Sequence, residues 1–378
     1  MENLVKQRLF AGGYEGTSVF VTGHTGFKGS WLCEWLLAMG ASVTGYSDKV
    51  DDGPTMFRAL GLEKRITHII GDVRDPDMLV SAIDAARPDY VFHLAAQPLV
   101  RLSYDEPVTT FETNVMGTVN VMEALRRLNQ SVACVLVTSD KCYENREVLS
   151  GYREDDPLGG YDPYSASKGA AEIAIHAYRR SFFMSGDSRV RVASGRAGNV
   201  IGGGDWSADR IVPDSARSLM ANQPIHVRNP FATRPWQHVL ESLSGYLWLG
   251  ALLAGQCQTA RVTTPVDASE GFNFGPLPNA NRTVEALIEE FLTHWPGTWT
   301  HTNDGSAHHE AALLGLSVER AYHKLDWSPV LDFEKAVALT ASWYRDTFNN
   351  TIAPRSKTLA DLAFYVNAAA SQEVAWAS

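Results

Sequence analysis

A tyrosine and a lysine four residues apart, Tyr164 and Lys168, are the side chains in this sequence with the clearest capacity for chemistry. Within a helix, residues at this spacing lie on the same face, so the ammonium would lie near the phenol. A nearby positive charge lowers the pKa of a tyrosine from its usual value of about 10. Tyr164 could then transfer protons near neutral pH. The same spacing also occurs by chance on amphipathic helices.

Three glycines, each three residues from the next, follow the apolar segment 19–21 and precede a helical segment. Their GxxGxxG spacing allows a tight turn and a close approach of the backbone to a pyrophosphate, which the helix N-terminus would bind. An ordinary glycine turn could carry the same letters, but the strand before it and the helix after it favour dinucleotide binding. A bound nicotinamide cation would lower the pKa of Tyr164 further. The cofactor contacts expected here are Gly23, Thr25, Gly26, Phe27, Lys28 and Gly29.

The form of the cofactor depends on residues that follow the second and third expected strands. Either Ser47 or Asp48 occupies the place where an acid binds the ribose 2′-hydroxyl, and Asp48 favours NAD. Lys49 leaves NADP open, and these charges could also be solvated turn residues. Asp72 and Val73 could frame the adenine, although Asp72 could equally cap the next helix.

Short apolar runs alternate with helical segments through the first half of the chain. We expect strands at 18–22, 42–47, 66–70, 90–95, 132–138 and 189–193, and helices at 30–39, 76–86, 107–128 and 163–183. This order predicts an α/β fold with a doubly wound parallel (Rossmann) sheet. Glycines and prolines break the chain after residue 197. We therefore predict a cofactor-binding domain at 1–197, to which a segment near 232–255 returns, and a smaller, mixed α/β C-terminal lobe at 198–378 that mainly binds the substrate.

Composition limits the partners. The 378 residues suit two packed lobes, and 33 Lys plus Arg against 43 Asp plus Glu give a net charge of −10, which argues against binding to nucleic acid. No apolar run approaches the roughly 18 residues of a membrane span, and residues 1–14 lack a signal-peptide core. The scattered cysteines predict no metal site, and Cys33 and Cys134 are expected in the core. We expect a cytoplasmic protein.

Taken together, the motifs resemble those of extended short-chain dehydrogenase/reductases that modify nucleotide sugars. The resemblance runs from about residue 17 to about residue 339 and includes HLAAQ at 93–97, NVMGT at 114–118, RAGNV at 196–200, RPWQHV at 234–239 and FNFG at 272–275. Two stretches, TSDKCYEN at 138–145 and DPLGGYDPY at 156–164, are most similar to the 4,6-dehydratases of this family that act on CDP-glucose.

The resemblance implies an internal redox cycle on CDP-glucose. Tyr164 would take the proton of the C4 hydroxyl while hydride passes from C4 to NAD. The C4 ketone would acidify C5, water would leave across C5 and C6, and hydride would return to C6. The product would be CDP-4-keto-6-deoxyglucose, a precursor of deoxy sugars in surface polysaccharide.

The elimination needs an acid at C6 and a base at C5. Ser139, Asp140 and Lys141 follow a core strand and should lie at the carboxyl edge of the sheet. We expect Asp140 to be the acid, with a pKa raised by burial, and Ser139 to hydrogen-bond the C4 oxygen. Relatives that act on dTDP-glucose carry glutamate at the place of Lys141. This lysine would be the base if its pKa falls below its usual value of about 10.4; otherwise it would stabilise the enolate or pair with an acid.

Further contacts are carried over from the family. The cofactor would also meet Leu94, Ala95, Ala96, Asn114, Tyr164 and Lys168, and the substrate would meet Gln97, Asn199, Arg210 and Arg234. Arg234 offers two donors to a diphosphate. Arg101, Arg210 and Arg228 are weaker candidates, because solvated surface arginines would look the same in sequence.

Two alternatives stay open at this point. A 4-epimerase would need Tyr164 and NAD but no acid and base at C6 and C5, so Asp140 and Lys141 favour a dehydratase, for CDP-glucose or another nucleotide sugar. A non-catalytic dinucleotide-sensing protein would not need Tyr164, Lys168 and Asp140 together. The helices at 107–128 and 163–183 pair across a two-fold axis in relatives, which implies a homodimer or homotetramer, although internal packing faces would look alike.

Overall fold

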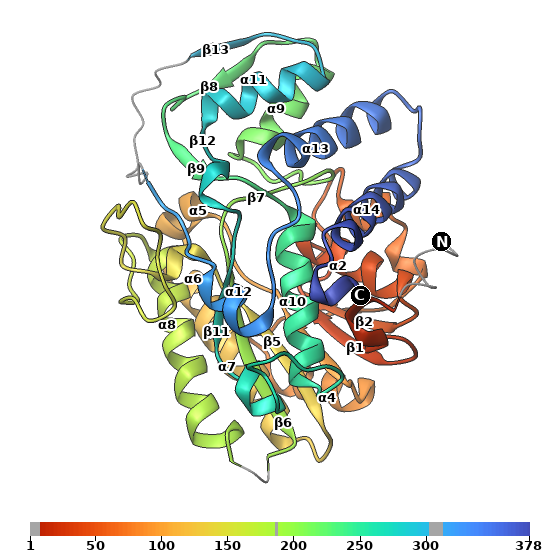
Figure 1. The fold of residues 1–378 in the computed structure, drawn as a ribbon, viewed down its shortest axis with the longest axis vertical. Coiled ribbons are helices and arrows are strands. Elements are labelled where there is room, and N and C mark those ends of the chain that lie inside the picture. The colour runs from red at the N-terminus through yellow and green to blue at the C-terminus, as the bar shows by residue number, and fades with distance from the viewer. Residues whose placement is uncertain (1–7, 186–187, 302–312) are drawn as a thin grey trace.

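The computed structural model, which describes residues 8–185, 188–301 and 313–378, contains a seven-stranded sheet between two layers of helices (Figure 1). Its strand order is β11-β6-β5-β4-β1-β2-β3, and every neighbouring pair is parallel. The doubly wound parallel sheet predicted from the sequence is therefore confirmed. The strands are β1 Ser18–Thr22, β2 Ser42–Ser47, β3 Thr67–Ile70, β4 Tyr90–His93, β5 Val132–Val137, β6 Val190–Ala197 and β11 Gly271–Phe274. Residues 1–7 of the segment expected to lack a signal peptide lie outside the described residues.

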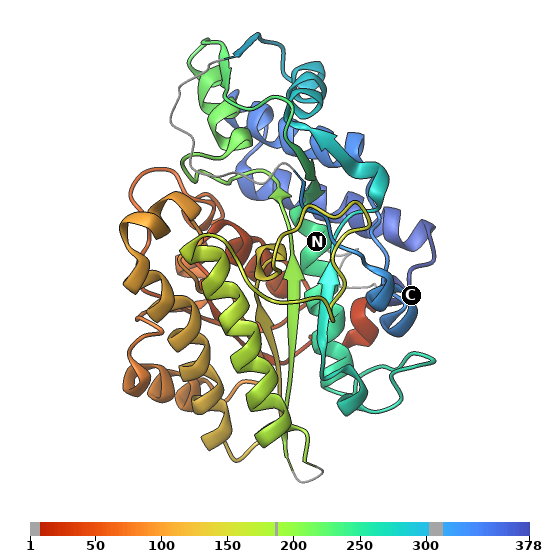
Figure 2. The same ribbon diagram turned by 90° about the vertical axis from the view of Figure 1, so that its left-hand side faces the viewer.

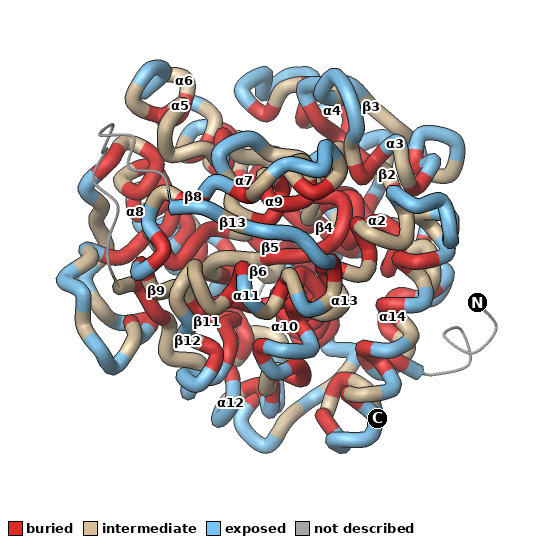
Figure 3. Tube along the Cα trace, turned by 90° about the horizontal axis from the view of Figure 1, so that it is seen from above, coloured by how far each residue is buried: buried red, intermediate tan, exposed pale blue. Residues whose placement is uncertain are grey.

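Strand side chains alternate between two cores, as a pleated backbone requires. Phe20 enters the core beneath α4 (Pro76–Ala86), α7 (Gly117–Arg127) and α8 (Pro163–Tyr178). Val19 and Val21 enter the opposite core, beneath α2 (Phe27–Ala38) and α10 (Val239–Leu253). Figure 2 shows α8 and its neighbours on one side of the sheet, and Figure 3 shows the buried residues gathered along the middle of the molecule. Cys33 and Cys134 are fully buried, which confirms them as core residues.

Most expected elements lie within one residue of their expected bounds, and the exceptions are β4, β6 and α2. Strand β4 ends at His93 rather than at residue 95. Strand β6 continues to Ala197, past the expected end at 193, because Ser194–Ala197 pair with β11. Helix α2 begins at Phe27 rather than 30. Each of the two long helices contains a π-helical turn, which inserts extra residues into the helix. The first consists of α6 Pro107–Phe111, η3 Glu112–Met116 and α7, and the second consists of α8 and η5 Arg179–Phe183.

Beyond β6 the chain builds small sheets and helices at one end of the main sheet (Figure 1). Three strand pairs form there: β7 Val200–Ile201 with β10 Gln237–His238, β9 Thr233–Pro235 with β12 Asn281–Thr283, and β8 Ile225–Val227 with β13 Trp299–His301. The helices of this part are α9 Ile211–Met220, α11 Val284–His294, α13 Phe333–Phe348 and α14 Pro354–Ser371, together with α12 Glu319–Leu325, which packs on β11 of the main sheet. Helix α10 packs on β5 and β6, and β11 lies in the main sheet although the sequence placed it in the second lobe. The two-domain division itself stays a prediction.

The C-terminal helix α14 is tied to the core through polar contacts as well as packing. Trp343 donates to Thr358 Oγ1 at 3.0 Å, and Tyr365 donates to the buried carboxylate of Glu241 at 2.8 Å. Two short helices, α3 Met56–Ala59 and α5 Val100–Asp105, complete the α-helices of the described residues. None of the described helices combines the length and the apolar character needed to cross a membrane.

Candidate active site

The five predicted catalytic residues meet where β5 ends and α8 begins. Ser139 caps the 3-10 turn η4 (Asp140–Cys142), because its hydroxyl accepts a hydrogen bond from the Lys141 amide at 3.2 Å. Asp162 caps α8 by accepting from the Ser165 amide at 2.9 Å, which places Tyr164 and Lys168 in the first turns of the helix. Turn η4 packs against α8. The two segments that carry the expected chemistry are therefore adjacent.

Tyr164 and Lys168 face each other as the spacing predicts. The lysine Nζ lies 6.0 Å from the centre of the tyrosine ring. Burial nevertheless raises the pKa of Tyr164 to about 12, while a hydrogen bond with Ser139 acts in the opposite direction. Burial also lowers the pKa of Lys168 to about 8, against the charge of Glu172. The expected fall in the pKa of Tyr164 is therefore not produced by the side chains alone, because desolvation outweighs the nearby positive charges.

Asp140 has the environment of a proton donor. It is buried, and burial raises the pKa of its carboxyl despite opposing effects of Lys141, Ser139 and Arg234. Its Oδ1 accepts from the Ser139 hydroxyl at 3.0 Å, whereas its Oδ2 is buried without a hydrogen-bond partner among the described residues. An unpaired buried oxygen is costly unless a ligand completes its bonding. The carboxyl is thus poised for a group that enters the site.

Lys141 is half-buried and close enough to Asp140 to lower the pKa of that carboxyl. This contact suits a lysine that pairs with the acid. It equally suits a base that works beside the acid. Its role stays a prediction.

The glycine turn has the geometry that its spacing predicts. Gly23 has φ +72°, and a Cβ there would lie 2.7 Å from the Ala95 amide nitrogen, so the turn runs directly against the loop after β4. A Cβ on Gly29 would lie 2.2 Å from the Gly23 carbonyl oxygen, which shows how closely the helix approaches the strand. Gly26 is the N-cap of α2 and supplies no capping side chain, so the first amides of the helix are available to an anion. Phe27 and Lys28 follow in the first turn.

The loop after β2 lies beside the glycine turn, as expected for a ribose site. Thr25 donates through Oγ1 to the Lys49 carbonyl at 2.7 Å, and the Ser47 hydroxyl lies 3.4 Å from the Thr25 amide nitrogen. Asp48 is exposed at this point, and Lys49 forms an ion pair with Asp51 at 3.1 Å. The lysine that left NADP open therefore already has an acidic partner.

Asp72 and Val73 follow β3 as expected. The Asp72 carboxylate binds the Arg74 guanidinium at 2.6 Å, and the Val73 carbonyl accepts from Asn120 at 2.9 Å. The alternative that Asp72 caps the next helix is wrong, because Asp75 caps α4 by accepting from the amides of the first turn.

Asn114 and Gln97 are engaged with each other. The Asn114 side chain accepts from the Gln97 amide at 2.8 Å and donates to the Gln97 carbonyl and to the Ser167 hydroxyl. The Gln97 side chain donates to Thr110 Oγ1 at 2.9 Å. Asn114 and Gln97, two predicted ligand contacts, therefore brace the loop that holds Leu94, Ala95 and Ala96, and their side-chain amide groups have partners within the chain.

Basic side chains also lie close to Tyr164 and Asp140. Burial lowers the pKa of Lys28 to about 7, with Arg210 and Lys168 acting in the same direction and Asp140 opposing them. Arg210 pairs with Asp205 at 3.0 Å, and its charge also lowers the pKa of Tyr164.

Arg234 lies on β9, and its charge lowers the pKa of Asp140. The backbone carbonyl of Asn199 accepts a hydrogen bond from the Gln237 amide at 3.3 Å. Two of the three weaker candidates, Arg101 and Arg228, pair with Asp209, at 3.2 and 3.3 Å.

Tyr246 is a site residue that the sequence did not indicate. Its hydroxyl lies 3.5 Å from Lys28 Nζ. Burial raises the pKa of Tyr246, and Tyr164 and Asp140 raise it further. It lies on α10, a helix that is buried throughout. A tyrosine in an apolar helix gives no local signal, because the contact joins residues 218 positions apart.

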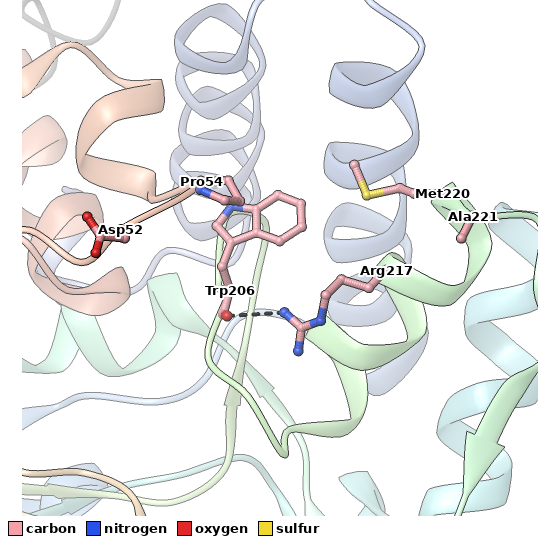
Figure 4. A pocket seen from close by; sticks show the side chains of 6 residues that line it. All are labelled: Asp52, Pro54, Trp206, Arg217, Met220 and Ala221. Atoms are coloured by element: carbon pink, nitrogen blue, oxygen red, sulfur yellow. Dashed lines mark hydrogen bonds between the residues drawn. The ribbon is translucent and has the colours of Figure 1, made fainter.

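A hollow on another part of the described structure has none of the predicted residues in its lining. It is lined by Asp52, Pro54, Trp206, Arg217, Met220 and Ala221 (Figure 4). The Arg217 guanidinium donates to the Trp206 carbonyl at 3.1 Å and pairs with Asp214. The catalytic candidates lie elsewhere, at the end of β5.

The sheet, the glycine turn and the Tyr–Lys pair define an extended short-chain dehydrogenase/reductase. The chain belongs to the family described as GDP-mannose 4,6 dehydratase, whose sequence profile matches residues 20–261. It is 46% identical over 336 residues to the CDP-glucose 4,6-dehydratase of Salmonella typhimurium, covering 88% of this chain and 91% of that protein. A dTDP-glucose 4,6-dehydratase of Mycobacterium tuberculosis is 25% identical over 87% of this chain and 93% of its own length. The family resemblance inferred from the motifs is confirmed.

Solved structures share the fold. The UDP-glucose 4-epimerase of Thermotoga maritima superposes with a TM-score of 0.71 at 22% identity, covering 87% of this chain and 99% of that structure. A dTDP-glucose 4,6-dehydratase of Bacillus anthracis, solved in complex with NAD, gives a TM-score of 0.70 at 18% identity, covering 88% and 97%. Epimerases and dehydratases thus share one architecture, and side chains at the site must distinguish them.

Proposed function

We propose that this protein is an NAD-dependent enzyme that converts CDP-glucose to CDP-4-keto-6-deoxyglucose and water. The observation that carries the proposal is the buried Asp140, whose Oδ2 has no partner among the described residues, beside Tyr164 and Ser139. A proton donor at this place is needed for the loss of a hydroxyl and is not needed for epimerisation. The 46% identity to a CDP-glucose 4,6-dehydratase supports the same reaction and is the basis for the cytidine nucleotide.

The uncapped N-terminus of α2 and the close turn at Gly23 fit the pyrophosphate of NAD, with Asp48 at the ribose. NAD bound there would supply the acceptor for the C4 hydride and, once reduced, the hydride donor for C6. The nicotinamide also carries a positive charge, which lowers the pKa of a nearby phenol. This charge would complement Lys168 at Tyr164, whose pKa of about 12 in the chain alone is too high for proton transfer near neutral pH.

The side chains divide the remaining chemistry. Tyr164 takes the proton of the C4 hydroxyl, and Ser139 hydrogen-bonds the same oxygen. Asp140, whose pKa is raised by burial, donates its proton to the departing C6 hydroxyl. Lys141, directly after Asp140, removes the C5 proton or stabilises the enolate. Arg234, with Arg210 and Asn199, holds the diphosphate.

The direct test is an assay of the purified protein with NAD and CDP-glucose. We expect a 4-keto-6-deoxy sugar, seen by its absorbance in alkali, and no net consumption of cofactor. Parallel reactions contain dTDP-glucose, UDP-glucose and GDP-mannose. Turnover of one of these without turnover of CDP-glucose would overturn the substrate, and a C4 epimer as product would overturn the reaction.

We further infer a homodimer built on the two long helices. Their outer faces expose large apolar side chains, and the largest exposed fractions are those of Val108 (68%), Ile173 (60%) and Met116 (50%). Phe182 on η5 is also exposed. Exposed apolar patches of this kind mark interfaces, and a second copy would pair the same helices. Light scattering of the wild type and of Ile173→Lys tests this. A wild-type monomer would contradict it, and a tetramer would require a second interface.

A further inference from the structure

A buried carboxylate, Glu172, lies one helical turn beyond Lys168 on α8. Its Oε2 accepts from Arg196 Nη2 at 2.7 Å and from the Ser194 hydroxyl at 2.9 Å. Its Oε1 accepts from the Thr138 hydroxyl. Glu172 and Arg196 form an ion pair in which both side chains are less than 10% exposed. Burial raises the pKa of Glu172, but Arg196 and the hydrogen bonds outweigh burial and keep it below its usual value.

The partners of Glu172 belong to the elements that carry the catalytic groups. Thr138 directly precedes Ser139 and Asp140, and Glu172 lies on the same helix as Tyr164 and Lys168. The pair thus connects the end of β5 to the helix that carries the tyrosine.

Arg196 holds the other end of the same turn. Its Nη1 donates to the Tyr143 hydroxyl at 2.7 Å and to the Glu154 carbonyl at 3.1 Å. Tyr143 in turn donates to Asn273 Oδ1 at 2.7 Å, on strand β11. Thr138 lies immediately before the cap of η4, and Tyr143 is its C-terminal cap. One ion pair therefore anchors η4 on both sides.

We propose that Glu172 and Arg196 are positioning residues that hold the turn with Asp140 and Lys141 at a fixed distance from Tyr164 and Lys168. The inference rests on the proposed function, because in that function these four side chains take part in the chemistry of one sugar ring. Such chemistry is sensitive to displacements of about 1 Å. A charged pair between rigid elements, with both carboxylate oxygens hydrogen-bonded to side chains, limits such displacements.

The decisive variant is Glu172→Gln combined with Arg196→Gln. Removal of one partner alone would leave the other charge buried, whereas removal of both charges is often tolerated. We expect kcat to fall about a hundredfold while KM stays within about threefold, because the substrate-binding arginines are untouched. Hydrogen exchange at the amides of residues 141–144 should rise at least about tenfold, as the turn opens more often.

Glu241→Gln is the matched control, because Glu241 is also a buried carboxylate with several donors but lies on α10 and contacts Val330, Leu331 and Tyr365. It should change the unfolding midpoint without changing kcat or exchange at η4. Thr138→Val is a milder variant that keeps the ion pair and the side-chain shape but removes one hydrogen bond to Glu172. It should lower kcat about tenfold with the same small effect on KM.

Wild-type kcat and wild-type exchange at η4 in a folded double variant would overturn the proposal. If the double variant does not fold, wild-type kcat and wild-type exchange at η4 in Thr138→Val would overturn the proposal instead. The exchange measurement needs no substrate. A wild type that leaves CDP-glucose unchanged therefore refutes the proposed function alone, and exchange at η4 still decides whether the pair holds the turn.

Discussion

Asp140 faces the backbone of Gly198 so closely that a Cβ at residue 198 would lie 2.6 Å from its Oδ2. This oxygen is the one that is buried without a partner among the described residues. The missing side chain at 198 therefore leaves room for the carboxyl in its present orientation. Gly198 belongs to the segment between β6 and β7 that also carries Asn199.

The first prediction concerns this space. Gly198→Ala should lower kcat by about ten- to a hundredfold, because the added methyl group must displace the carboxyl from the departing hydroxyl. The measurement is kcat together with the unfolding midpoint. Gly275→Ala is a suitable control, since its Cβ would lie 3.5 Å from the nearest atom, an ordinary contact. Equal activity of the two variants would show that the orientation of Asp140 does not matter.

A second prediction separates oxidation from elimination. Asp140→Asn cannot donate the proton that the departing hydroxyl needs, so product formation should fall about a thousandfold while C4 oxidation continues. Reduced nicotinamide should then accumulate, visible by its near-ultraviolet absorbance. In the wild type the acid form exists below the raised pKa of Asp140, so elimination should weaken as pH rises through that value. Loss of oxidation as well would assign Asp140 a different role.

The third prediction tests the tyrosine. Lys168→Met removes a positive charge 6.0 Å from the ring of Tyr164 and should raise the pKa of the phenol in the working enzyme. The acid limb of the pH profile of kcat/KM should move to higher pH, and the rate at neutral pH should fall about a hundredfold. Tyr164→Phe serves as the reference without a titrating phenol. An unmoved acid limb would mean that Lys168 acts only in binding.

Lys141 is tested by isotope exchange. If it removes the C5 proton, Lys141→Ala should lose most of the deuterium that enters C5 from heavy water during turnover, while hydride transfer from C4 persists. Mass spectrometry of the product gives the label directly. Undiminished incorporation would exclude the base role and leave Lys141 as an electrostatic partner.

The last prediction concerns stability. Burial raises the pKa of Glu241 from 4.5 to about 7, so the folded protein holds a proton there that the unfolded chain has lost. Its contribution to stability is full below about pH 4.5 and decreases by about 3 kcal/mol as pH rises to about 7. Glu241→Gln should remove this decrease. Denaturant unfolding at several pH values checks it, and parallel curves for both proteins would refute it.

The sequence alone was sufficient for the local parts of the site. The bounds of β1, β2 and α4 match those expected, because apolar runs and the residues that end them are close in sequence. The turn at Gly23 and the shared helix face of Tyr164 and Lys168 are also local properties. They depend on backbone conformation and on a spacing of four residues.

Other features were decided only by the tertiary structure. The pKa of Tyr164 is raised rather than lowered, because many distant residues together bury the phenol. The raised pKa of Asp140, by contrast, agrees with the prediction. Tyr246 reaches Lys28 across 218 positions, and the Asn114 side chain accepts a hydrogen bond from the Gln97 amide. No spacing rule encodes these contacts, because each arises where separate elements pack. The sequence therefore determined which groups were available, and packing determined their environment and their partners.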